Sequence, residues 1–123
     1  MTSHSLILRT KKRIPLTRED VFEIINSHLI KRGHPDSVIE VEVVGKTKIS
    51  SLNQKYLSKH GPTDVLSFPL ERVPGEKNNL IGTIVLCSDI ISSEAKTNGT
   101  TYSQEFGLKL THGLDHLLGK HHK

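Results

Sequence analysis

The sequence predicts a single α+β domain in which helices pack against a mixed β-sheet. The chain has 123 residues, a length that suits one domain with a modest core. Short segments rich in β-branched residues are interleaved with longer segments in which apolar residues recur at helical spacing. No internal repeat or low-complexity segment divides the chain, so we expect residues 1–123 to form one domain.

Strands and helices are expected in the order β-α-β-α-β-β-α-α. The predicted strands cover residues 6–9, 38–44, 65–68 and 80–86. The predicted helices begin at residues suited to an N-terminal cap, namely Thr17, Thr47, Asp89 and Thr101. Residues 73–79 are rich in proline, glycine and asparagine, so a loop within the domain is expected there.

The first helix has a clear start and a clear end. Asp20 stands three residues after Thr17, the spacing of a capping box, and the helix is expected to reach about Arg32 before Gly33 stops it. Its apolar residues recur every three or four positions: Val21, Ile24, Ile25 and Leu29. The strand that follows alternates apolar residues with glutamates, which is typical of a strand with one solvent-facing side.

The last helix carries the most informative pattern of the chain. Thr101, with Gln104 three residues later, predicts a second capping box, and Gly119 is expected to end the helix just after Leu118. The predicted buried stripe of this helix comprises Phe106, Leu110, Gly113, Leu114 and Leu117.

The composition and the N-terminal sequence indicate the cellular compartment in which the protein works. The single cysteine, Cys87, excludes an internal disulfide framework, and no run of apolar residues is long enough to span a membrane. The N-terminus places its apolar stretch before a basic cluster, the reverse of a secretory signal. We therefore expect a cytoplasmic protein with no membrane partner.

The basic residues are concentrated in the first half of the chain. The net charge is +4, and residues 1–60 contain eleven lysines and arginines against six acidic residues. Residues 61–123 contain six against seven. Lys11, Lys12 and Arg13 could therefore hold the backbone of a polyanion such as RNA, although an ordinary solvated arm has the same composition.

Histidines at the C-terminus have the spacing of a metal site. His112 and His116 are four residues apart, so they lie on one face of a helix, one turn apart. Gly119 can take a left-handed conformation and turn the chain, which would bring His122 back toward that face. His121 competes with His122 for this role, but the spacing H-x-x-x-H-x-x-G-x-x-H favours His122.

Three neutral imidazoles with one open coordination position are the ligands of a catalytic zinc ion. Nickel, copper or cobalt could occupy the same ligands, although zinc fits best. The metzincin proteases share this histidine framework, but Gly113 stands where they carry their glutamate base. Two other carboxylates are near in sequence: Glu105, a candidate to support a ligand imidazole, and Asp115, which we expect to be exposed.

Two blocks of the sequence resemble the YbeY-type endoribonucleases, metal-dependent bacterial proteins of rRNA maturation. The block from His112 to His122, HGLDHLLGKHH, is similar to the family signature H-G-x-L-H-L-x-G-Y-D-H. The block from Pro62 to Pro69, PTDVLSFP, is similar to the family's P-T-D-V-L-S-F-P. Residues 81–84 resemble its L-G-D-I strand, and the similarity covers about residues 38–122.

The resemblance implies a single-strand-specific endoribonuclease that matures rRNA near the 3′ end of the small-subunit RNA. Its partners would be rRNA and the small ribosomal subunit. His112, His116 and His122 would bind one Zn²⁺ ion per chain, and no catalytic residue is assigned. The family usually has an arginine after its tyrosine, where this chain has Leu57, and an aspartate where this chain has Thr83.

Two other functions remain open from the sequence. A metzincin-like metallohydrolase or peptidase would use the same three histidines, but Gly113 cannot serve as its base. A catalytically weakened, metal-stabilised ribosome-assembly factor would keep the metal and the ribosome without cleavage, and Leu57 is consistent with that alternative.

Overall fold

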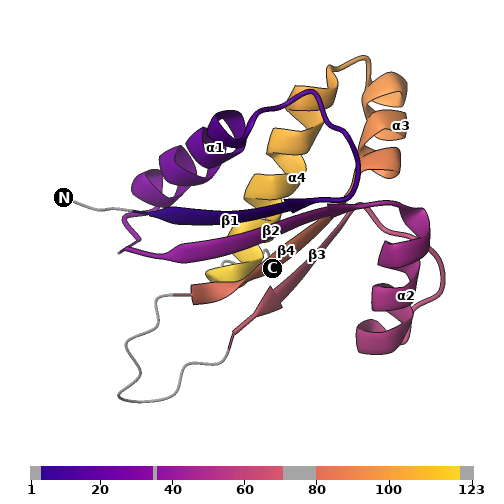
Figure 1. The fold of residues 1–123 in the computed structure, drawn as a ribbon, viewed down its shortest axis with the longest axis horizontal. Helices are drawn as coiled ribbons and strands as arrows, with labels where there is room; N and C mark the ends of the chain where they lie inside the picture. Colours follow the sequence, from indigo (N-terminus) through magenta and orange to yellow (C-terminus); the bar gives the residue numbers. More distant parts are fainter. Residues whose placement is uncertain (1–3, 35, 71–79, 120–123) are drawn as a thin grey trace.

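A computed structural model describes residues 4–34, 36–70 and 80–119. Figure 1 shows an α+β fold, which confirms the predicted class and the predicted order of elements. The strands are β1 (Ser5–Thr10), β2 (Val38–Val44), β3 (Val65–Pro69) and β4 (Leu80–Cys87). The helices are α1 (Arg18–Lys31), α2 (Lys46–Leu57), α3 (Ser88–Asn98) and α4 (Tyr102–Leu117).

The four strands form one mixed sheet in the order β1-β2-β4-β3. β1 and β4 both run parallel to the central strand β2, whereas β3 runs antiparallel to β4. The connections through α1 and α2 are long enough for parallel pairing, which requires a crossover. β3 is therefore an edge strand, with one side open to other contacts.

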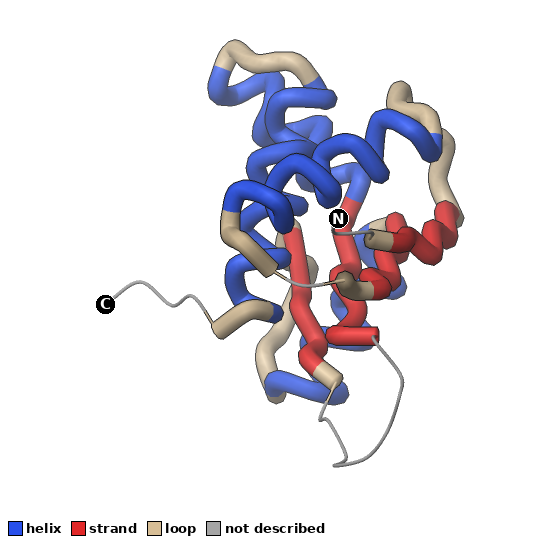
Figure 2. The backbone as a smooth tube through the Cα atoms, turned by 90° about the vertical axis from the view of Figure 1, so that its left-hand side faces the viewer, coloured by secondary structure: helices blue, strands red, loops and turns tan. Residues whose placement is uncertain are grey.

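The helices cover the two faces of the sheet unequally. α1, α3 and α4 lie on one side of the strands and α2 on the other, as Figures 1 and 2 show. The main core lies under α1 and α4, where Ile25, Phe106 and Leu110 pack without solvent exposure against Ile39 and Ile84. A smaller core under α2 includes Ile49, Leu66 and Val85. Among the described helices, only α2 lies over this second face, and it covers that face in part.

The capping residues explain where the helices start. The capping boxes predicted for α1 and α4 are both present, since Thr17 and Thr101 each accept a hydrogen bond from the third helical residue. The starts predicted at Thr47 and Asp89 are wrong. α2 begins after Gly45, and α3 begins directly at the end of β4.

Asp89 has a different partner from the one expected. Its carboxylate lies near the first turn of α2, where it accepts a hydrogen bond of 3.4 Å from the backbone N–H of Lys46. A helix N-terminus favours a negative charge, so Asp89 stabilises the neighbouring helix rather than capping its own. Among the helices of the described ranges, none has the length and apolar content needed to cross a membrane.

Candidate metal centre

The last helix is held against the sheet by a close contact at a glycine. Gly113 is buried, and the carbonyl oxygen of this residue accepts a hydrogen bond of 3.1 Å from the Ser67 hydroxyl of β3. A Cβ atom at position 113 would lie only 2.9 Å from a methyl carbon of Ile84. The absence of a side chain therefore lets α4 approach β3 and β4 closely.

His112 and His116 lie beside this contact and face the same cleft. Their ring centroids are 5.5 Å apart, and the ring planes are inclined by 32°. Both side chains are exposed and line a cleft of about 510 Å³ at the edge of the sheet. We call it the histidine cleft, and its lining includes Leu57, Asp64, Ser67, Lys109, His112 and His116. The predicted pairing of the two imidazoles on one helix face is thus present.

The third predicted ligand, His122, follows the end of α4. Gly119 has a φ of +74°, so the left-handed turn expected after the helix is confirmed. His122 and its competitor His121 lie outside the described residues. Within the described ranges, no group of three or more histidine, cysteine, aspartate or glutamate side chains is placed to hold a metal ion. Two imidazoles one helical turn apart fit a divalent ion as two of its ligands.

Gly113 could not be replaced by a base that serves this cleft. Its α-carbon points toward Ile84, Val65 and Ser67, which belong to the sheet beneath the helix. A Cβ atom there would lie 2.9 Å from Ile84, 3.2 Å from Ser67 and 3.3 Å from Val65, so a glutamate side chain has no room between the helix and the sheet. A general base that acts beside His112 and His116 must therefore be supplied by a residue other than the one at position 113.

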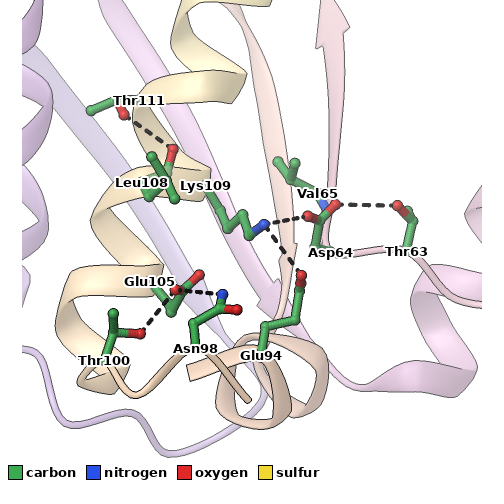
Figure 3. A network of polar contacts seen from close by, with 10 residues as sticks. All are labelled: Thr63, Asp64, Val65, Glu94, Asn98, Thr100, Glu105, Leu108, Lys109 and Thr111. Carbon is green, nitrogen blue, oxygen red and sulfur yellow. Dashed lines mark hydrogen bonds and ion pairs between the residues drawn. The ribbon is translucent and has the colours of Figure 1, made fainter. Parts of the chain in front are cut away.

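Glu105 does not support a ligand histidine, contrary to the sequence-based prediction. The residue is only 3% exposed, and one carboxylate oxygen accepts hydrogen bonds from Asn98 (3.0 Å) and Thr100 (2.9 Å). These hydrogen bonds lower the pKa of the Glu105 carboxyl below its ordinary value. As Figure 3 shows, Glu105 points into the connection between α3 and α4, where it fixes the start of the helix.

Asp115 is likewise not the exposed residue that was expected. Its carboxylate accepts hydrogen bonds from His28 (2.8 Å) and from both an Nε and an Nη group of Arg32 (3.0 and 2.9 Å). Burial alone would raise the pKa of the Asp115 carboxyl, but the hydrogen bonds from Arg32 and His28 outweigh it and lower that pKa. The prediction failed because α1 crosses α4 at this turn, a contact that α4's own periodicity does not reveal.

A lysine-centred network in the cleft was missed by the sequence-based prediction. The ammonium group of Lys109 lies 2.9 Å from a carboxylate oxygen of Asp64 and 3.4 Å from one of Glu94. Figure 3 shows Lys109 pointing from α4 toward both carboxylates. Lys109 precedes His112 by three residues and His116 by seven, so helical spacing alone could have placed it on the histidine face.

This network keeps its members charged. Burial would raise the pKa of the Asp64 carboxyl, but hydrogen bonding and attraction to Lys109 lower it below its ordinary value. Burial would lower the pKa of the Lys109 ammonium, but Asp64 and Glu94 raise it. The Asp64 carboxylate also accepts a hydrogen bond of 2.8 Å from the N–H of Val65, which fixes its position at the start of β3. At neutral pH the cleft therefore contains an ionised carboxylate and a cation beside the histidines.

The basic residues predicted to hold RNA lie elsewhere. Lys11, Lys12 and Arg13 follow β1 and line a separate hollow of about 460 Å³. Among the described residues, that hollow and the histidine cleft have no lining residue in common. β1 and β3 are at opposite edges of the sheet, so the basic segment and the histidines are separated by the width of the sheet.

Together, the fold and the cleft define an α+β protein with paired histidines at a sheet edge. The chain belongs to the YbeY endoribonuclease family, because the family model described as "Endoribonuclease YbeY" matches residues 7–123. An endoribonuclease YbeY of Alteromonas mediterranea is 38% identical over 97 residues, covering 79% of this chain and 61% of the relative. Its counterpart from Leifsonia xyli is 37% identical over 99 residues, covering 76% and 65%.

A third relative and a solved structure agree with this assignment. The endoribonuclease YbeY of Cutibacterium acnes is 39% identical over 97 residues, covering 74% of this chain and 63% of its own length. The solution structure of TM1509 from Thermotoga maritima superposes with a TM-score of 0.65 at 27% identity, covering 96% of this chain and 75% of that one. The aligned part of each curated relative is thus under two thirds of its length.

Proposed function

We propose that this protein is a metal-dependent endoribonuclease that cleaves single-stranded RNA and takes part in rRNA maturation, near the 3′ end of the small-subunit RNA. The observation that carries the proposal is the pairing of His112 and His116 in one cleft, at the positions of the family signature. The relatives that match most of the chain are named as endoribonucleases, which supports the same activity here.

His112, His116 and His122 would hold one divalent ion, and zinc suits three imidazoles best. Held by these residues, such an ion would supply a water of lowered pKa and positive charge beside a phosphoryl oxygen. The packing of α4 fixes the backbone positions of His112 and His116, so one helix face presents both proposed ligands, with ring centroids 5.5 Å apart.

Asp64 and Lys109 are proposed to act on the RNA in the same cleft. Asp64 stays ionised at neutral pH, so its carboxylate can accept a hydrogen bond from the attacking water and orient it. Lys109 is held between two carboxylates with only 14% of its side chain exposed, and its charge reduces their repulsion of a phosphate. Asp64 lies just before β3, and Lys109 lies on α4 one turn before His112, so neither role depends on a side chain at position 113.

The partners follow from this activity. Single-stranded rRNA would be the substrate, the small ribosomal subunit would be the assembly that presents it, and the cytoplasm would be the location. The basic segment of Lys11, Lys12 and Arg13 could contact RNA backbone remote from the cleft, since its hollow is separate from the histidines.

The residue at position 57 bears on how efficiently the proposed enzyme would cleave RNA. Leu57 lines the histidine cleft and is 48% exposed, at the position where the family usually has an arginine. A leucine cannot form the bidentate contact that a guanidinium makes with a phosphate. Binding and cleavage must therefore be measured separately.

The test compares cleavage and binding of one labelled RNA, as a single strand and as a duplex, with and without a chelator. The proposal predicts cleavage of the single strand that stops with the chelator and with His112→Ala, while His121→Ala cleaves like the parent protein. Tight RNA binding without cleavage by zinc-loaded protein would instead support the alternative of a catalytically weakened ribosome-assembly factor. Cleavage that persists in the chelator would contradict the metal-dependent mechanism.

A further inference from the structure

A second hollow lies on the face of the sheet that α2 covers only in part. Its volume is about 320 Å³, and its lining includes Glu42, Lys48, Leu52, Tyr56, Phe68 and Thr83. Of the residues that the structure describes, none lines both this hollow and either the histidine cleft or the basic hollow that follows β1. The metal centre and its proposed chemistry do not account for it.

Aromatic side chains form one wall of this hollow. The rings of Tyr56 and Phe68 meet edge to face, with centroids 5.2 Å apart and planes inclined by 63°. Tyr56 is 56% exposed, and the ammonium of Lys55 lies 5.2 Å from the centroid of its ring. An exposed aromatic ring beside an open sheet face is the feature on which single-stranded RNA-binding domains stack bases.

A carboxylate in the hollow is available for a ligand. Glu42 is half-buried on β2, opposite Val85 of β4, and the structure gives its side chain no hydrogen bond or ion pair within the described ranges. Glu40, two residues earlier on the same face, is occupied: it accepts a hydrogen bond of 2.8 Å from Thr83 and one of 3.4 Å from Arg9. Glu42 can therefore accept two hydrogen bonds from a bound group.

The hollow and the histidine cleft lie on opposite sides of the edge strand β3. Successive side chains of a strand point to opposite faces, so Ser67 lines the cleft and Phe68 lines the hollow. The end of α2 is divided in the same way, with Tyr56 in the hollow and Leu57 in the cleft. A single polynucleotide strand that passes over this edge could occupy both, because the described part of the chain places no further strand beside β3.

We propose that this hollow binds a nucleobase of the RNA, with a preference for guanine, next to the cleaved phosphate. The inference rests on the proposed endoribonuclease function and adds a base-binding subsite to it. The base would stack on Tyr56, and the N1–H and amino group of guanine would donate to the two oxygens of Glu42. Uracil offers a single N–H between two carbonyl groups, so it matches a carboxylate poorly. Lys48 and Lys55 would face the flanking phosphates.

The experiment measures binding of fluorescein-labelled hexaribonucleotides by anisotropy, with the zinc-loaded protein of residues 1–123. The probes are oligouridine and the same oligomer with one guanine. The parent protein should bind the guanine probe about tenfold more tightly, as expected for one paired carboxylate–base contact. Glu42→Gln should remove most of that preference, and Glu40→Gln should keep it. Tyr56→Ala should weaken binding of both probes by about tenfold, the effect of losing one stacking partner, whereas Tyr56→Phe should bind normally.

The outcomes separate this inference from the proposed function. RNA binding and chelator-sensitive cleavage with no base preference, unchanged in Glu42→Gln and Tyr56→Ala, would overturn the base-binding subsite alone. No binding or cleavage of either RNA by the parent protein would overturn both proposals. Thermal unfolding of each variant shows whether a loss of binding reflects a loss of the fold.

Discussion

The Ser67 hydroxyl and the Gly113 carbonyl oxygen form a hydrogen bond of 3.1 Å that joins the edge strand to the last helix. His112 directly precedes that glycine, and His116 follows it by three residues. The distance of the histidines from β3 is therefore set by how closely the helix approaches the sheet, and that approach depends on the missing side chain at position 113.

Adding a single methyl group at this contact should destabilise the protein. Gly113→Ala gains helix propensity but forces a Cβ atom to within 2.9 Å of Ile84, an overpacking that typically costs about 1–3 kcal/mol. Gly107, on the same helix, is a matched control, because a Cβ atom there meets only Ile24 at 3.8 Å. Gly107→Ala should raise the free energy of unfolding by about 0.5–1 kcal/mol through propensity alone. Denaturant titrations measure the free energy of unfolding of each variant. We expect Gly107→Ala to be more stable than the parent, and Gly113→Ala to be less stable than Gly107→Ala by about 1–3 kcal/mol because of the overpacking. Equal free energies of unfolding in the two variants would contradict the close contact.

Restoring a guanidinium at the rim of the histidine cleft should strengthen RNA cleavage. Leu57 is exposed and lines the cleft, so Leu57→Arg places five N–H donors where a phosphate would bind. We expect kcat/KM on single-stranded RNA to rise about tenfold, the gain from a charge-assisted pair of hydrogen bonds. Ile30→Arg adds the same charge at an exposed position of α1 that does not line the cleft. An equal rise in both variants would show a general charge effect instead.

Removal of the Lys109 ammonium should alter the pH dependence of cleavage. Lys109 lowers the pKa of the Asp64 carboxyl, and burial would raise that pKa once the cation is absent. In Lys109→Met the acid limb of the pH–rate profile should move to higher pH, and kcat/KM at neutral pH should fall about tenfold. Lys109→Arg keeps the charge and should retain the parent profile. A profile unchanged in Lys109→Met would exclude Asp64 from the reaction.

Loss of the Asp115 carboxylate should weaken the junction of α1 and α4. Hydrogen bonds from His28 and Arg32 to a charged acceptor stabilise the fold by about 1–3 kcal/mol, so Asp115→Asn should lower the free energy of unfolding by that amount at pH 7. Because the pKa of Asp115 is lower in the folded protein, this stabilisation is complete above its ordinary value of 3.8 and is lost as the pH falls through the folded-state pKa. The difference between variant and parent should therefore shrink in acid. A constant difference from pH 7 to pH 3 would contradict the ion pair.

Local sequence patterns were sufficient for the order and approximate bounds of the elements. The capping boxes at Thr17 and Thr101 and the left-handed glycine at position 119 are short-range features, and all three are present. The alternation in residues 38–44 likewise predicted the central strand. Such features need only a few neighbouring residues, and these can be identified from the sequence.

The errors arose where residues distant in the sequence come together. Asp115 is tied to α1, 87 residues from His28, and no periodicity within α4 indicates that partner. Glu105 accepts a hydrogen bond from Thr100, in the connection that precedes its own helix. Asp64, just before β3, forms an ion pair with Lys109 of α4. The pairing of His112 and His116 was predictable because it lies within two turns of one helix.

The proposed function requires that His112, His116 and His122 bind one metal ion together. The most direct measurement is the zinc stoichiometry and affinity of the purified protein of residues 1–123, with single alanine variants at residues 112, 116, 121 and 122. We predict one zinc ion per chain in the parent and in His121→Ala, and a loss of at least about 100-fold in affinity in each of the other three variants. Parent-like zinc binding by His122→Ala, or its loss in His121→Ala alone, would contradict the proposed ligand set.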